Sequence, residues 1–188
     1  LDLAKVAECN YFFIRFHSEL ANDVFNVVFI SLGSAVAIII GQLLGAGKMK
    51  EAKEQNTQIL AFSVFTCLIM GTAMIFVAPL FPELYEAPDI VKSLATSMIK
   101  IMACFMPMCA FVHASYFTLR SGGKTFITFL FDSAYVWCIV IPFAFFLTEC
   151  TPLTILPIFA LCQGIDIIKC VIGFILVKKG VWLNNIVN

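Results

Sequence analysis

Residues 24–47 have the sequence VFNVVFISLGSAVAIIIGQLLGAG, which contains no charged side chain over 24 residues. An α-helix needs about 20 apolar residues to cross the hydrocarbon core of a bilayer, which is about 30 Å thick. The stretch therefore predicts a membrane-spanning helix. Gly33, Ala37, Gly41 and Gly45 recur every four positions and share one helical face, so we expect a neighbouring helix to approach closely there.

The composition of the whole chain also indicates a membrane protein. Of its 188 residues 61% are apolar and 13% are charged, and the mean hydropathy is +0.98. Soluble domains are about 45–50% apolar and about 25% charged, so a water-soluble fold would expose large apolar faces. The net charge is zero, which argues against a nucleic acid as partner and leaves the lipid bilayer as the expected surroundings.

Four more apolar runs follow and predict an all-α integral membrane fold with five spans. The five lie at about 24–47, 55–82, 93–119, 125–148 and 151–177. Pro107 predicts a kink in the third span, and Thr151 with Pro152 predicts the start of the fifth helix, with Thr as the N-cap. Residues 1–23 carry seven acidic, basic or histidine side chains and predict an irregular or interfacial segment. Because Leu1 is not an initiator Met, we expect the chain to begin inside a longer reading frame.

The connections between the spans predict the orientation. Since loops alternate sides, the segments 48–54 and 120–124 and the tail after 177 share one face. That face carries Lys48, Lys50, Lys53, Arg120, Lys124, Lys178 and Lys179, whereas the opposite face carries Lys92 with Glu83, Glu86, Asp89 and Glu149. Basic loops remain in the cytoplasm. We therefore expect a multi-pass cell-membrane protein with the basic face inside.

Two segments end like a phosphate-binding loop without completing it. Gly47-Lys48 and Gly123-Lys124-Thr125 match the last letters of the motif, but Gln42 and Thr118 stand where its first glycine is required. The eight cysteines form no Cys-x-x-Cys pair and no metal-ligand spacing with the two histidines. No nucleophile–base set is present either, so we expect no enzyme, no metal and no cofactor.

Three motifs resemble the multidrug and toxic compound extrusion (MATE) family of transporters. The segment 41–48 with 51–53 resembles the loop after the second helix of a lobe in that family. The segment 118–125, followed by Asp132, Trp137, Ile141 and Pro142, looks like the hinge between the fourth and fifth helices. The ending Lys-Lys-Gly-Val-Trp at 178–182 fits the end of the second lobe. The motifs occur in order and cover residues 24–187.

The resemblance implies that residues 24–188 are helices eight to twelve of a twelve-helix antiporter, which is five of the six helices of its C-terminal lobe. Residues 1–23 do not resemble the first helix of that lobe, which is therefore missing or divergent. The N-terminal lobe of the same transporter is the implied partner. The motif loops, with a structural role, contain Gly41, Gly45, Gly47, Arg120, Gly122, Gly123, Lys124 and Thr125.

The implied function is export of small, often cationic organic compounds, coupled to influx of protons or sodium ions. Sodium-coupled members of the family use acids on the first and fourth helices of this lobe. The equivalent fourth helix, residues 93–119, contains no Asp or Glu and departs from that pattern. Two alternatives remain open: a related flippase for lipid-linked precursors, and a truncated membrane fragment that does not transport.

Charged residues within the spans are the first candidates for the pathway, since each costs about 2.5–3.5 kcal/mol to insert. They are Lys100, Asp132, Asp166 and Lys169. Asp132 lies eight residues after Lys124 and Lys169 lies nine before Lys178. At about 1.5 Å per residue both lie roughly 12 Å from the same face and can form an interhelical ion pair. Asp166 and Lys169 can also meet along one helix.

We therefore expect a cluster of Asp132, Asp166 and Lys169 that faces the lobe interior, either for transport or only for helix packing. Three further candidates each have a second interpretation. Lys100 can extend to the outer face of the membrane, His113 can take part in proton coupling or simply pack, and Tyr116 can contact a planar cation through its ring.

Overall fold

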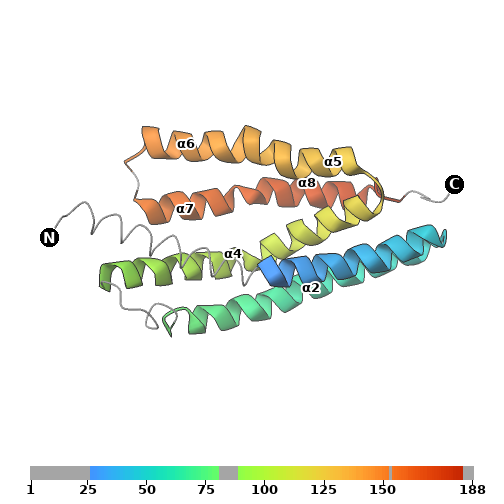
Figure 1. Cartoon of the computed structure of the whole chain (residues 1–188), viewed down its shortest axis with the longest axis horizontal. Helices are drawn as coiled ribbons and strands as arrows, with labels where there is room; N and C mark the ends of the chain where they lie inside the picture. Colours follow the sequence, from blue (N-terminus) through green and yellow to red (C-terminus); the bar gives the residue numbers. More distant parts are fainter. Residues whose placement is uncertain (1–25, 81–88, 153, 184–188) are drawn as a thin grey trace.

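The computed structural model describes residues 26–80, 89–152 and 154–183 (Figure 1). These ranges are helical, without a strand. In chain order the helices are Asn26–Gly45, α2 (Met49–Val77), α4 (Asp89–Ser121), α5 (Thr125–Phe129), the π-helical segments η1 (Leu130–Ala134) and η2 (Val136–Val140), α6 (Ile141–Cys150), α7 (Ile155–Gly164) and α8 (Asp166–Lys178). The irregular segment expected at 1–23 lies outside the described residues.

In the part of the chain that the structure describes, five helices are long and apolar enough to cross a membrane. They are Asn26–Gly45, Met49–Val77, Asp89–Ser121, Thr125–Cys150 and Ile155–Lys178, in which α5 to α6 form one spanning helix and α7 with α8 another. The all-α membrane fold expected from the composition is therefore confirmed. Many large apolar side chains on α2, α6 and α8 lie on the outside of the bundle, as in a protein whose surface faces lipid tails.

Several helix boundaries differ from the expected ones, such as the start of α4 at Asp89 where residue 93 was expected. Helix α2 begins at Met49, so most of the connection expected at 48–54 is the first turns of α2. Helix α7 begins at Ile155, with Thr154 as its N-cap, whereas the start was expected at Thr151. Thr151 has extended backbone angles, as the residue before a proline prefers, and its hydroxyl donates to the carbonyl of Leu147 at the end of α6.

Helix α4 is the centre of the bundle and contacts α2, α5, α7 and α8. Small residues allow the close approach of α2, since a β-carbon on Gly71 would lie 2.6 Å from the carbonyl oxygen of Ala103. Pro107 lies inside α4, and Figure 1 shows this helix changing direction between its green and yellow parts. A proline removes one backbone hydrogen bond and clashes with the preceding turn, which accounts for the bend.

The small-residue face expected on the first helix is not its packing face. The buried positions of this helix are Phe29, Gly33, Val36, Ile40 and Leu44, so only Gly33 of the expected set is buried. A β-carbon at Gly33 would lie 2.1 Å from the Phe117 ring, whereas one at Gly41 would meet nothing within 4 Å. Large aliphatic side chains take the buried positions because they remove more surface and make more dispersion contacts than glycine.

Three similar turns end helices at the basic end of the bundle, on the right of Figure 1. Each has a glycine with positive φ: 73° at Gly47, 75° at Gly123 and 68° at Gly180. In each, the amide one residue later donates to a carbonyl five positions earlier, as from Lys48 to Leu43 at 3.0 Å. This is the Schellman motif, which favours glycine because other residues are strained at positive φ. The incomplete phosphate loops are thus helix caps.

One polar contact joins α2 to α4 near the same end. The buried Thr118 hydroxyl lies 2.6 Å from Asn56 Oδ1, to which it donates, and 2.9 Å from the carbonyl oxygen of Ala114. Buried polar groups require partners because an unpaired one loses its hydration without compensation. The contact therefore fixes how α2 and α4 are rotated toward each other.

Candidate functional site

An ion pair links α8 to the fourth spanning helix. Lys169 Nζ donates to Asp132 Oδ1 over 2.6 Å. Lys169 is only 8% exposed, whereas the Asp132 side chain is 54% exposed in the described bundle. The interhelical contact expected from the equal depths of these two residues is therefore present. The carboxylate does not lie in an enclosed interior, as was expected, but at the edge of the bundle.

The helix that carries Asp132 has wide turns at this point. Residues Leu130–Ala134 and Val136–Val140 are π-helical, and α6 then begins at Ile141 with Pro142 in its first turn. Pro142 has no amide hydrogen to donate to the carbonyl four residues earlier, so regular α-helical bonding fails there. A π-helical turn changes the angular position of the residues around it and is frequent at functional sites.

Aromatic side chains surround the buried ammonium group. Lys169 Nζ lies 5.5 Å from the ring centroids of both Phe131 and Tyr135. Such contacts stabilise a cation by about 0.5–2 kcal/mol, depending on desolvation. The Tyr135 hydroxyl donates to the carbonyl oxygen of Ile165 over 2.8 Å. Both rings and the lysine line a cavity of about 200 Å³ between the two helices.

Asp166 makes no direct polar contact with Lys169. It is partly buried, and the structure has no ion pair or hydrogen bond between Asp166 and Lys169 among the described residues. The helix is interrupted by a turn at Ile165, so Asp166 occupies the first position of α8, where a carboxylate interacts favourably with the helix dipole. Of the expected three-residue cluster, the direct contact in the described residues is therefore the ion pair of Asp132 and Lys169, and the participation of Asp166 stays a prediction.

The other three candidates lie on α4, and among the described residues none of them forms a hydrogen bond or ion pair with Asp132 or Lys169. Lys100 is exposed, as expected for a lysine that extends to the membrane surface. His113 Nδ1 donates to the carbonyl oxygen of Cys109 at 2.9 Å, and its ring stacks on Phe29 with centroids 4.9 Å apart. Tyr116 packs edge-on against Phe117 at 5.5 Å. The contacts of His113 and Tyr116 belong to the packing of α4.

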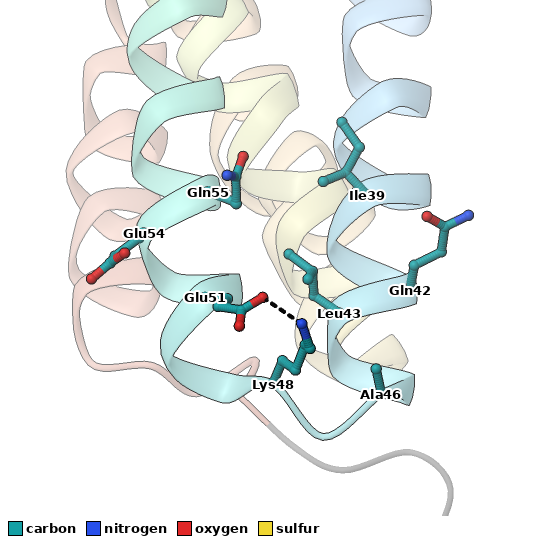
Figure 2. Close-up of a pocket in the computed structure, with 8 residues that line it drawn as sticks. All are labelled: Ile39, Gln42, Leu43, Ala46, Lys48, Glu51, Glu54 and Gln55. Carbon is teal, nitrogen blue, oxygen red and sulfur yellow. Dashed lines mark hydrogen bonds and ion pairs between the residues drawn. The ribbon is translucent and has the colours of Figure 1, made fainter.

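The first motif loop lies beside a separate cavity of about 610 Å³ between the helix Asn26–Gly45 and α2. Figure 2 shows two of its lining residues, Lys48 and Glu51, pointing toward each other, and they are joined by an ion pair of 3.0 Å. Both side chains are exposed, so the pair adds about 0–1 kcal/mol to stability. The lysine that would hold a phosphate in a nucleotide-binding loop is thus paired with a carboxylate.

The loop after α4 uses its two glycines differently. Gly123 supplies the positive φ of the turn, whereas Gly122 is buried and a β-carbon there would lie 2.2 Å from the carbonyl oxygen of Trp182. Arg120 and Thr125 are exposed. No hydrogen bond or ion pair joins a described residue of this loop to Asp132 or Lys169, and the structural role expected for the motif residues stays a prediction.

Two residues of the site were not singled out in the sequence. Phe131 and Tyr135 contact the lysine, and Tyr135 follows Phe131 by four residues, which places both on one face of a helix. That spacing is a signal available in the sequence. Among the described residues, no group of three His, Cys, Asp or Glu side chains is close enough to hold a metal ion.

Comparison with known proteins identifies the family. The family model MatE matches residues 19–146, which is more than half of the chain and includes Asp132 but not Lys169. No curated protein and no solved structure matches the chain. The matched range contains the motif loops at 41–53 and 118–125 and four of the five spanning helices up to the first part of α6. The chain therefore belongs to the MatE family of membrane transporters.

Proposed function

We propose that the chain works in a secondary antiporter that exports small, often cationic organic compounds in exchange for inward protons or sodium ions. The observation that carries this proposal is the ion pair between Lys169 and Asp132, within two spanning helices. Ionisable groups inside a membrane are costly, and they are often retained where ions or substrates pass. An N-terminal lobe is the proposed partner in the membrane.

The unequal exposure of the two partners suggests how the pair responds to a cation. Asp132 offers an accessible carboxylate, whereas Lys169 is held among Phe131 and Tyr135. A proton, a sodium ion or a protonated amine that reaches Asp132 competes with Lys169 for the carboxylate. Once Asp132 is neutralised, the buried ammonium group has lost its counter-ion, and an arrangement of α8 that hydrates or re-pairs it becomes favourable.

The basic end of the bundle supports a cytoplasmic location for the loop 120–124 and for the turn after α8. Its three turns carry Lys48, Lys124 and Lys179 beside their glycines. By the positive-inside rule this end faces the cytoplasm of a cell membrane. Asp132 then lies about 12 Å from the inner surface, at the rise of about 1.5 Å per residue.

The test is ethidium efflux by cells that express the protein from its complete reading frame, with proton and sodium gradients collapsed separately. Asp132→Asn and Lys169→Met should each abolish efflux at unchanged protein level, and Lys100→Met, an exposed lysine of another helix, is the matched control. If collapse of one gradient stops efflux and collapse of the other does not, the ion of the first gradient is the coupling ion. Normal efflux in both variants would limit the pair to helix packing, and absence of efflux in the parent would favour a non-transporting chain.

A further inference from the structure

A second cavity, separate from the ion pair, lies on the side of the bundle. It has a volume of about 780 Å³, with walls from α2 and α8 and a floor that includes Phe111 of α4. Apolar side chains form most of its lining, among them Leu60, Val64, Phe65 and Phe174. Phe65 and Phe174 are each more than half exposed, so the cavity is a groove that opens sideways.

Two lysines lie at one end of this groove. Lys53 of α2 and Lys178 of α8 both line it at the basic end of the bundle, and both are exposed. Neither has a carboxylate partner among the described residues; the acid next to Lys53, Glu54, lines the separate cavity of Figure 2. Lys178 Nζ lies 5.6 Å from the Phe174 ring, which places its ammonium group directly above the apolar lining.

The length of the groove corresponds to one leaflet of a bilayer. Its lining on α2 extends from Lys53 to Leu68. Fifteen residues of α-helix rise about 22 Å, and half of the hydrocarbon core measures about 15 Å. A molecule with its head at Lys53 therefore has room for an extended acyl chain along the whole leaflet. An apolar groove with cations only at its membrane-surface end matches the two ends of a phospholipid.

We propose that this groove is a binding site for an anionic phospholipid from the leaflet at the basic end. The phosphate lies between Lys53 and Lys178, and an acyl chain follows Leu60, Val64 and Phe65 toward the membrane centre. Basic pockets between spanning helices bind acidic head groups in this way. A lipid with a net negative head group, such as phosphatidylglycerol, binds better than phosphatidylcholine, whose own choline cation is repelled by the two lysines.

The first test measures lipid retained by the purified chain with native mass spectrometry, after exchange into defined mixtures of phosphatidylglycerol and phosphatidylcholine. The parent should retain phosphatidylglycerol preferentially. The double variant Lys53→Gln, Lys178→Gln should lose about five-fold in affinity per lysine. The matched control is Lys50→Gln with Lys179→Gln, which removes two lysines of the same face that do not line the groove. Equal retention of the two lipids by the parent, or equal loss in both double variants, would overturn the proposal.

The second test asks what lies in the groove. Ala61 is exposed and lines it, so Ala61→Trp places a fluorophore among the acyl chains. Brominated phosphatidylglycerol should quench the added emission more strongly than brominated phosphatidylcholine, and the difference should disappear in the Lys53→Gln, Lys178→Gln background. An added tryptophan that neither lipid quenches would show that protein covers the groove. A dimer mass in the native mass spectrum would then identify that protein as a second copy of the chain. Either result contradicts the proposal.

Discussion

The two ends of the ion pair are not equivalent. Lys169 is buried at 8% exposure between apolar and aromatic side chains, whereas Asp132 lies half-exposed at the edge of the bundle. Removing one partner of a buried pair leaves the other charge uncompensated, and the cost depends on how well that remaining charge can be hydrated. The lysine has the poorer access and therefore depends more on its partner.

We predict that Asp132→Asn lowers the free energy of unfolding by about 1–3 kcal/mol, because it leaves the buried ammonium group with a weaker acceptor. Lys169→Met should cost less than Asp132→Asn, since it removes the buried charge and fills the same volume with an apolar side chain. Reversible unfolding in mixed micelles measures both. The double variant should recover part of the loss of Asp132→Asn. A larger loss for Lys169→Met than for Asp132→Asn would contradict this account.

At the scale of the elements, the three turns at the basic end share one construction. Each places a glycine at positive φ and closes the helix with the same pair of backbone hydrogen bonds. The pairs Gly47-Lys48 and Gly123-Lys124 arise because the cap requires glycine and the membrane surface favours lysine. Two separate demands on neighbouring residues thus produce the end of a phosphate-loop motif without a phosphate site.

We predict that Gly122→Ala destabilises the protein by about 1–3 kcal/mol. Its β-carbon would lie 2.2 Å from a backbone atom of Trp182, and backbone cannot move aside as a flexible side chain does. Gly41→Ala is the matched control, because nothing lies within 4 Å of its β-carbon. It should be neutral or stabilise by up to about 1 kcal/mol, since alanine favours a helix over glycine. Thermal unfolding in detergent compares them; equal melting temperatures would exclude the proposed clash.

At the scale of the whole molecule, the spans connect so that the caps of three helices lie at one end and the turn between α6 and α7 lies at the other (Figure 1). Cys150, at the end of α6, is exposed on that other side. Lys124 begins the turn into α5 at the basic end. Positions 150 and 124 therefore provide one labelling site for each face of the membrane.

We predict that a membrane-impermeant maleimide labels Cys150 in intact cells, because the positive-inside rule places this end outside. The amount of label on Cys150 is the difference in maleimide labelling between the parent and the Cys150→Ser variant. Lys124→Cys in the Cys150→Ser background should be labelled only after the membrane is permeabilised. Labelling of position 124 in intact cells, with no label on Cys150, would reverse the proposed orientation.

Much of the fold was predictable because helix length and apolar composition are local properties. The five spans, their order and the shared end of the basic loops follow from runs of uncharged residues and from the alternation of loops. The contact of Asp132 with Lys169 was predictable too, since the rise per residue of an α-helix is nearly constant and the two residues are almost equally far from the basic ends of their helices. The starts of the helices were less predictable. Thr151, which precedes a proline, matches the pattern of an N-cap, yet its hydroxyl donates to the carbonyl of Leu147 in the preceding helix.

Rotation of each helix about its own axis was decided only by the tertiary structure. Helices that are apolar on every side have no polar face to set this angle, so sequence periodicity could not tell Gly41 from Ile40 as the packing residue. The same angle decides that Lys169 reaches Asp132 and not Asp166, and that Lys53 and Lys178 meet at one groove. The sequence by itself determined the number and order of the spans and the shared end of their basic loops. Packing of side chains in three dimensions determined which faces meet.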